Sequence, residues 1–184
     1  FNARSNKLCV GQDSIRNGDF EVKISMPKEI NNNYAPAMFS FYSYNKDGEE
    51  GNGASENVYV YGYDETAKPD TEGPEIEYLA LNSTSFKNGD KVNESPMVLA
   101  EFRDESGINI STSGIGHQMT IVIDEKDFIS DVSQYYTPSI GEGYGGTVSY
   151  PLSDLTAGYH SLRFKVWDTA NNSSEKTIEF TVEP

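Results

Sequence analysis

Three short acidic segments contain the residue types that bind a hard metal cation. They are "DTEG" at 70–73, "DESGIN" at 104–109 and "DTANN" at 168–172. Carboxylate and amide oxygens are the ligands that Ca²⁺ takes in proteins, usually about six to eight of them per ion. Because the three segments lie far apart in the sequence, they form a site only if the fold brings them together.

Strand order predicts that the three segments meet. In an antiparallel sandwich, a first strand that begins after Asp70, a second that ends at Asp104 and a later one that ends at Asp168 place these ends at the same pole. The candidate ligands for calcium are therefore Asp70, Glu72, Asp104, Asp168 and Asn171. The alternative is that these residues only form turns, where Asp and Asn are favoured because their side chains bond to nearby backbone. Their spacing does not match an EF-hand loop.

A second candidate is the loop "SQYYTPSIGEGYGGT" at 133–147, which carries Tyr135, Tyr136 and Tyr144. Exposed tyrosines on a loop can contact a protein partner or stack on sugar rings. They can equally cover the open edge of a sandwich or pack into its core. The sequence leaves both interpretations open.

Catalytic chemistry has little support in the sequence. Cys9 is the single cysteine, so the chain has no internal disulfide, and only His117 and His160 could serve as its base. Each of these histidines fits a strand pattern, and a buried structural thiol is the expected role for Cys9. We find no metalloprotease, hydroxyl-nucleophile, glycosidase or phosphate-loop signature. No catalytic residue and no organic cofactor is expected.

Charge argues against nucleic-acid binding, and hydropathy argues against a transmembrane segment. The net charge of −15 and the absence of any Lys/Arg cluster argue against nucleic acid, which requires a basic face. Cations suit the charge better. No run of about 18 apolar residues occurs, so no transmembrane segment is predicted.

The elements that must position the candidate residues are strands. From residue 75 onward, alternating apolar and polar runs recur at the spacing of a β-sandwich: 75–82, 96–104, 117–125, 146–153, 159–168 and 175–183. Weaker pairing potential lies in 127–140. Leu162, Phe164 and Val166 share one face after a glycine turn, as at the corner between the fifth and sixth strands of an immunoglobulin domain. These observations predict an immunoglobulin-like sandwich over 70–184.

The first part of the chain has a weaker strand pattern. Alternating runs at 18–26, 38–45 and 57–64 predict strands, the last two joined by a long polar connection. The segment "ETAKPDTEGPE" at 65–75 has two prolines and no apolar period, which indicates a linker. We therefore expect an all-β protein of two consecutive β-sandwich domains. A small β domain at 1–69 would precede the immunoglobulin-like domain at 70–184.

Several longer stretches resemble a known family. "DTEGP", "DESGIN…GIGH" and "YPLSDLTAGYHSLRFKVWDTANNSSE" are similar to the region that follows the catalytic domain in cell-surface sortases of the bacterial type IX secretion system, within the gingipain-like C25 peptidases. The resemblance covers roughly residues 70–183, and the earlier "GDFEVKISMPKEINNNYAPAMFSFYSYNKDGEEGNG" is similar with less distinctive motifs. It implies a Bacteroidetes protein at the cell surface, associated with the outer membrane.

The resemblance also implies a function for the fragment. The complete family members cleave C-terminal secretion signals with a Cys and a His of a caspase-like domain, and neither Cys9 nor His117 lies in a matching motif. We therefore expect a non-catalytic accessory region that positions the enzyme and contacts other outer-membrane components of the secretion system. The rival hypothesis is a carbohydrate-binding or adhesin-like surface module, with a glycan as partner. An aromatic platform on one face would favour this rival.

Overall fold

The protein is built almost entirely of β-strands, as predicted. The computed structural model describes residues 7–30, 34–62, 64–111, 116–126, 129–141 and 144–183. In these ranges the only helical element is a single 3₁₀ turn, η1 (Ser133–Tyr135). Nothing in them is both helical and of the length and apolarity that crossing a membrane requires.

The chain divides into two compact units. One comprises residues 30–69, and the other combines residues 1–29 with 70–184. The boundary between residues 69 and 70 lies within the segment 65–75 that the sequence indicated as a linker. The N-terminal segment, by contrast, groups with the sandwich although 40 residues of the other unit separate them in sequence.

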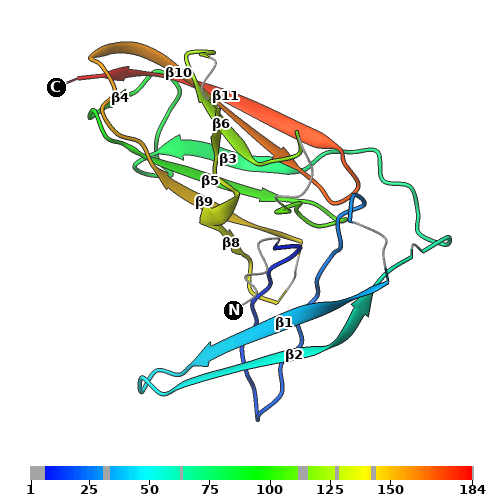
Figure 1. Ribbon diagram of the computed structural model, residues 1–184. Helices are drawn as coiled ribbons and strands as arrows, with labels where there is room; N and C mark the ends of the chain where they lie inside the picture. Colours follow the sequence, from blue (N-terminus) through cyan, green and yellow to red (C-terminus); the bar gives the residue numbers. More distant parts are fainter. Residues whose placement is uncertain are drawn as a thin grey trace. The chain divides into compact units, whose positions relative to one another are not determined.

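The smaller unit is a long β-hairpin (Figure 1). β1 (Ala35–Tyr44) pairs antiparallel with β2 (Glu50–Val60), with one bulge between Ala37 and Phe39. The sequence predicted a polar connection over 46–55, but the ladder continues through Gly51 and Gly53 and the turn spans only a few residues. Main-chain hydrogen bonds form this ladder, and they do not require apolar side chains.

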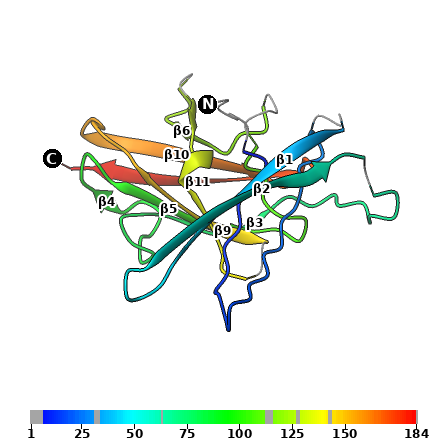
Figure 2. The same cartoon turned by 60° about the horizontal axis from the view of Figure 1, so that its bottom comes forward.

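The larger unit is a sandwich of two sheets. The first sheet has the strand order β4-β11-β10-β6-β7 and the second has the order β3-β5-β9-β8. Their strands are β3 (Glu75–Leu81), β4 (Lys91–Val92), β5 (Met97–Arg103), β6 (Thr120–Ile123), β7 (Ile129–Asp131), β8 (Tyr136–Pro138), β9 (Gly145–Pro151), β10 (Gly158–Trp167) and β11 (Ser173–Val182). Figure 2 shows β10 and β11 lying over β5 and β9.

This order is that of an immunoglobulin domain. β3, β5, β9 and β8 occupy the places of strands A, B, E and D, while β11, β10 and β6 occupy those of G, F and C. β7 extends the second group as an additional edge strand, and the two-residue β4 pairs parallel with β11. The six strands predicted in this half are all present, although β6 is shorter than its apolar run.

The core lies between the two sheets and is made by alternate residues of the central strands. Phe102 of β5 meets Phe164 of β10 with ring centroids 5.4 Å apart, and both side chains are fully buried. Leu162 and Val166 are buried on the same face of β10, as the period of two predicted. His160 also faces inward, whereas Tyr159 is exposed and is not the packed corner aromatic of antibody domains.

The N-terminal segment lies along the sandwich without joining a sheet as a strand. The predicted strand at 18–26 is wrong: Val22 and Ile24 are half-buried in alternation, but no ladder forms there. Hydrophobic alternation reports which side chains are buried, and it does not show that a neighbouring strand offers hydrogen bonds. Gln12 instead bridges Ile140 beyond the end of β8, and its side-chain amide donates to the carbonyl of Pro138 at 2.6 Å.

Candidate functional site

The alternation that builds the core also delivers two aspartates to one end of the sandwich. Val98, Ala100 and Phe102 of β5 face inward, and Asp104 continues this series just beyond the strand. On β10 the inward series of Leu162, Phe164 and Val166 continues to Asp168, whose exposed fraction is 0%. Because the two strands belong to opposite sheets, the aspartates approach each other across the end of the core.

The third carboxylate, Asp70, reaches the same end from the segment that precedes β3. Its place depends on Gly73, which lies against the first residues of β11. A Cβ atom at Gly73 would stand 2.6 Å from the carbonyl carbon and oxygen of Ser173. Real Cβ atoms do not approach backbone so closely, so only glycine lets this segment lie where Asp70 reaches the pole.

The three aspartates form one compact group. One carboxylate oxygen each from Asp70, Asp104 and Asp168 lies within 4.8 Å of the others. Asp168 is fully buried, and the other two are partly buried. The strand-order argument made from the sequence therefore places these three acids correctly with respect to one another.

Neighbouring turns hold the group through hydrogen bonds. The hydroxyl of Ser106 donates to Asp70 Oδ2, and its backbone N–H donates to Asp104 Oδ1 at 2.8 Å. Asn172 clamps Asp168, because its backbone N–H and its amide Nδ2 each donate to one carboxylate oxygen at 2.7 Å. The same amide also donates to the carbonyl of Asp70 at 3.2 Å, so one side chain links two of the segments.

Sequence reasoning missed Ser106 as part of this site. The sequence offers one signal, since a Ser two residues after an Asp and followed by Gly is typical of a turn. In the structure, Gly107 adopts a positive φ of 85° in this turn. Thr169 strengthens the connection, since its hydroxyl donates to the carbonyl of Ser106 at 2.5 Å. Segments 104–109 and 168–172 are thereby joined side by side.

The electrostatics of the group differ from one carboxylate to the next. The hydrogen bond from Ser106, followed by the backbone N–H of Glu72, lowers the pKa of Asp70. Burial, with repulsion from Asp168 and Asp70, raises the pKa of Asp104 to about 6. Bringing the charges together therefore costs free energy, which a cation among them would recover.

The chemistry of this donor set selects the kind of cation. All three groups are carboxylates, and no Cys or His belongs to the group. Oxygen ligands suit the hard cations Ca²⁺ and Mg²⁺, and a group of three carboxylates suits Ca²⁺ better, because Mg²⁺ usually keeps several waters and takes only one or two carboxylates.

The other two predicted ligands occupy different places. Glu72 is exposed and is not part of the group; it contributes only the backbone N–H that donates to Asp70 Oδ1 at 3.0 Å. Asn171 adopts a positive φ of 74° in the turn, and its Nδ2 donates to Glu29 Oε1 at 3.2 Å. Its Oδ1 is the one buried side-chain oxygen or nitrogen in the described ranges that lacks a hydrogen-bond partner.

The tyrosines of the 133–147 loop divide between packing and exposure. Tyr136 lies against Phe102 and donates its hydroxyl to the carbonyl of Gly145 at 2.7 Å, and burial raises its pKa. Tyr135 is partly exposed and meets the edge of Tyr150 with centroids 4.9 Å apart. Tyr144 is also partly exposed. The loop therefore contributes one ring to the interior and leaves two at the surface.

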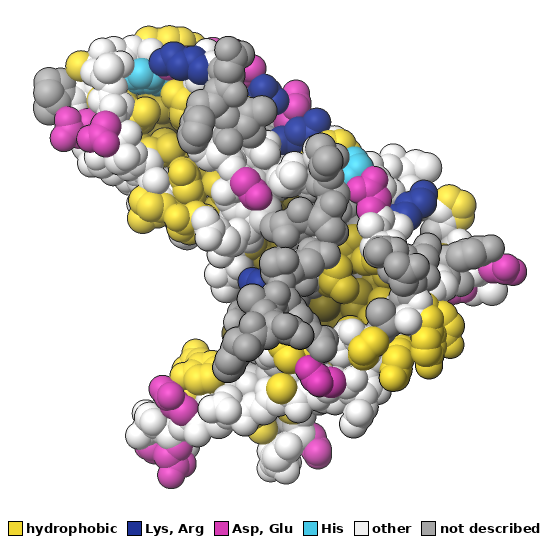
Figure 3. Space-filling view, in the orientation of Figure 1, with side chains coloured by type: hydrophobic (Ala, Val, Ile, Leu, Met, Phe, Trp, Pro, Cys, Tyr) yellow, Lys and Arg dark blue, Asp and Glu magenta, His cyan; other side chains and the backbone are white. Residues whose placement is uncertain are grey.

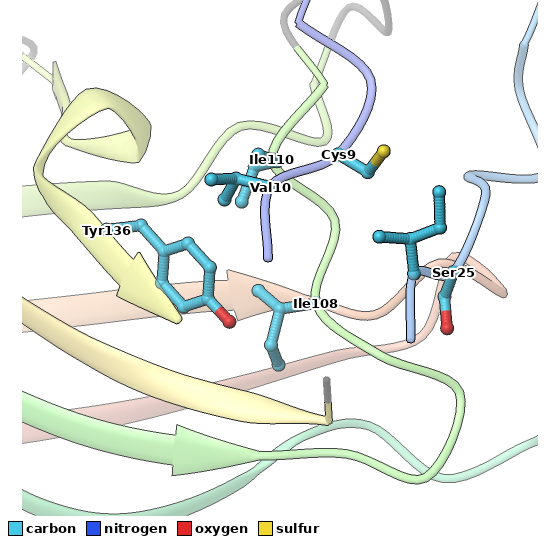
Figure 4. A pocket seen from close by; sticks show the side chains of 7 residues that line it. Cys9, Val10, Ser25, Ile108, Ile110 and Tyr136 are labelled. Atoms are coloured by element: carbon cyan, nitrogen blue, oxygen red, sulfur yellow. The ribbon is translucent and has the colours of Figure 1, made fainter. Parts of the chain in front are cut away.

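Cys9 belongs to the N-terminal segment and lines a small pocket together with Val10 and Ile110 (Figure 4). Burial raises the pKa of its thiol, the opposite of what an activated nucleophile requires. His117 Nδ1 pairs with Glu29 Oε2 at 2.7 Å, and its ring forms a T-shaped pair with that of Trp167. His160 uses both ring nitrogens, one toward Asp124 at 2.8 Å and one toward the carbonyl of Thr156 at 2.7 Å.

Comparisons with known proteins identify a similar solved structure. No family model matches the chain, and no curated protein does. Among solved structures, the chain is similar to dimeric latent PorU from Porphyromonas gingivalis, with 32% sequence identity and a TM-score of 0.61. The match covers 87% of this chain and 15% of that chain. The chain thus resembles a small part of a much longer protein.

Proposed function

We propose that this chain is a non-catalytic accessory region of a PorU-like protein, a cell-surface sortase of the type IX secretion system. The observation that carries the proposal is the similarity to PorU at 32% identity over 87% of the chain. The motifs in 70–74, 104–117 and 150–175 resemble the same family in sequence alone. The work of the region would be to position the catalytic domain at the outer membrane and to contact other components of the secretion apparatus.

The state of the nucleophile candidates supports a non-catalytic role. The raised pKa of Cys9 favours the neutral thiol, and both ring nitrogens of His160 are engaged in hydrogen bonds. The immunoglobulin-like topology also suits a scaffold, because its rigid sheets present loops and edges to partners.

The test separates chemistry from positioning in the complete protein. Deletion of the region that corresponds to 70–184 should leave cleavage of a short soluble peptide substrate intact. It should abolish the processing of folded cargo at the cell surface, measured as the accumulation of cargo that retains its C-terminal signal. Normal cargo processing by the truncated protein would contradict a positioning role, and loss of peptide cleavage would show that the region belongs to the catalytic machinery.

A specific observation favours a second property, calcium binding. We infer that Asp70, Asp104 and Asp168 hold a Ca²⁺ ion that joins the linker to the end of the sandwich. The convergence of three carboxylates within 4.8 Å, one of them fully buried, supports this inference. Asn171 lies in the same turn as Asp168, and its buried Oδ1 lacks a hydrogen-bond partner. Calcium-dependent melting of the chain tests the site.

A further inference from the structure

The hairpin has two faces of different chemistry. Side chains alternate across a strand, and pairing across the hairpin places opposite residues on the same face. One face carries apolar groups: Ala37, Phe39, Phe41, Val58 and Val60. The other, which we name the tyrosine face, carries Tyr34, Met38, Tyr42, Tyr44, Tyr59 and Tyr61.

The rings of the tyrosine face are strongly exposed and gather at two places. The exposed fractions of its five tyrosines lie between 48% and 77%. Tyr34 stacks on Tyr59 with centroids 4.7 Å apart and meets the edge of Tyr61 at 4.8 Å. Toward the turn, Tyr42 and Tyr44 lie 6.1 Å apart. At about 3.3 Å per residue, the two ring groups stand roughly 26 Å apart along β1.

Small and polar side chains flank these rings. Asn52 lies opposite Tyr42, Ala54 opposite Ser40, and Glu50 opposite Tyr44. A hydrogen bond between Tyr42 and Glu50 places an acceptor beside the rings. This face therefore combines open aromatic surfaces with amide, carboxylate and hydroxyl groups, whereas a purely hydrophobic interface would need aliphatic neighbours.

That combination matches the chemistry of sugars. The C–H groups of a pyranose ring pack on an aromatic face, while its hydroxyls pair with planar polar side chains such as Asn and Glu. Two ring groups on one ribbon suit a chain of several sugars better than a single one. A two-stranded hairpin with large exposed aromatic area also gains stability from a ligand that covers it.

Charge decides which kind of polymer fits. Residues 30–69 contain six acidic and two basic side chains, and acidic groups gather at the turn between β1 and β2 (Figure 3). An anionic polymer would be repelled by this field. We propose that the tyrosine face of the β1–β2 hairpin binds successive pyranose rings of a neutral polysaccharide.

The experiment uses the whole chain and a panel of soluble neutral polysaccharides, namely mannan, laminarin, dextran and xylan, with alginate as the anionic comparison. Affinity electrophoresis measures retardation in gels that contain each polymer. At least one neutral polymer should retard the chain, and alginate should not. Replacing Tyr42 and Tyr44 together by Ala should weaken binding at least tenfold, and the same change at Tyr59 and Tyr61 should do likewise.

Matched variants keep the result interpretable. The double variant Tyr42→Phe and Tyr44→Phe preserves the rings and should retain affinity within about threefold, which separates stacking from general damage to the hairpin. Tyr159→Ala removes an equally exposed tyrosine from β10 and should change nothing. The proposal is overturned if no neutral polymer binds, if alginate binds as well as they do, or if the Ala variants bind normally. It is also overturned if the tyrosines instead mediate self-association, seen as a fall from dimer to monomer in the Ala variants.

Discussion

Replacing Asp104 by Asn should have opposite effects in the absence and presence of calcium. Asn keeps the size of the side chain and can still accept the hydrogen bond from the Ser106 N–H, but it removes one negative charge from the group. Without calcium, the variant should be more stable than the unaltered chain at neutral pH. Adding calcium should raise the stability of the variant much less than it raises that of the unaltered chain.

The magnitude follows from the pKa of Asp104, which is raised from 3.8 to about 6. Each unit of pKa corresponds to about 1.4 kcal/mol. Ionisation of a fully buried carboxyl with this pKa would therefore lower the free energy of unfolding by roughly 3 kcal/mol. Because Asp104 is partly exposed, solvent screening reduces this cost, and we expect about 1–2 kcal/mol. The folded state binds the extra proton, so the free energy of unfolding should fall as pH rises from 3.8 to about 6 and stay reduced above it.

Calcium binding should stabilise the folded chain by more than the ionisation of Asp104 destabilises it. At a concentration about 100 times the dissociation constant, a ligand that binds only the folded state adds about 2.7 kcal/mol. For a chain of this size each kcal/mol raises the melting temperature by about 2–4 °C, so the unaltered protein should melt roughly 5–11 °C higher in calcium than in chelator. Asp104→Asn should keep only a small part of that rise.

The assay is thermal unfolding followed by circular dichroism, in chelator and in millimolar calcium, over a series of pH values. Asp154→Asn is the matched control: Asp154 is exposed, lies outside the group and has a positive φ of 58° that Asn tolerates. It should respond to calcium as the unaltered chain does. An equal calcium-induced rise in Asp104→Asn and in the unaltered chain would refute the reasoning, as would the absence of any rise in the unaltered chain.

Three further predictions concern the frame around the site. Gly73→Ala should lower the free energy of unfolding by about 1–3 kcal/mol and weaken the calcium response, because its Cβ would meet the Ser173 backbone; urea titration with and without calcium measures both. Asp124→Asn should cost about 1–3 kcal/mol at neutral pH, since Asp124 accepts hydrogen bonds from His160 and the Ser161 N–H. Its pKa is lowered, so this stabilisation is lost as pH falls through the folded pKa, and urea titrations in acid should bring the variant and the unaltered chain together. Phe164→Ala should cost about 3–5 kcal/mol by leaving a cavity beside Phe102, measured by the same titration at neutral pH.

Several features of the fold could be predicted from the sequence because they depend on local periodicity. The period of two in 96–104 and 159–168 identified β5 and β10 and the face of β10 that builds the core. The same period, continued by two residues, already marks Asp104 and Asp168 as inward-facing. Antiparallel strand order then suffices to predict that both acids and Asp70 lie at one pole.

The sequence was least informative where backbone contacts rather than side-chain patterns decide the structure. The segment at 18–26 alternates like a strand, yet it lies along the sandwich without a ladder, because a neighbouring strand must also offer free hydrogen-bonding groups. Conversely, β2 extends through Gly51 and Gly53, which have low strand propensity, because β1 supplies partners for their backbone.

By itself, the sequence determined the all-β class, the main strands of the sandwich and the three aspartates that could meet. Only the tertiary structure decided which oxygens approach within 4.8 Å, that Ser106 and Asn172 hold them, and that Glu72 stays outside the group. It also decided that five tyrosines of the hairpin share one exposed face, since that depends on strand pairing and on the position of a bulge. The physical reason is that periodicity sets which way a side chain points, whereas distance depends on elements that lie far apart in the chain.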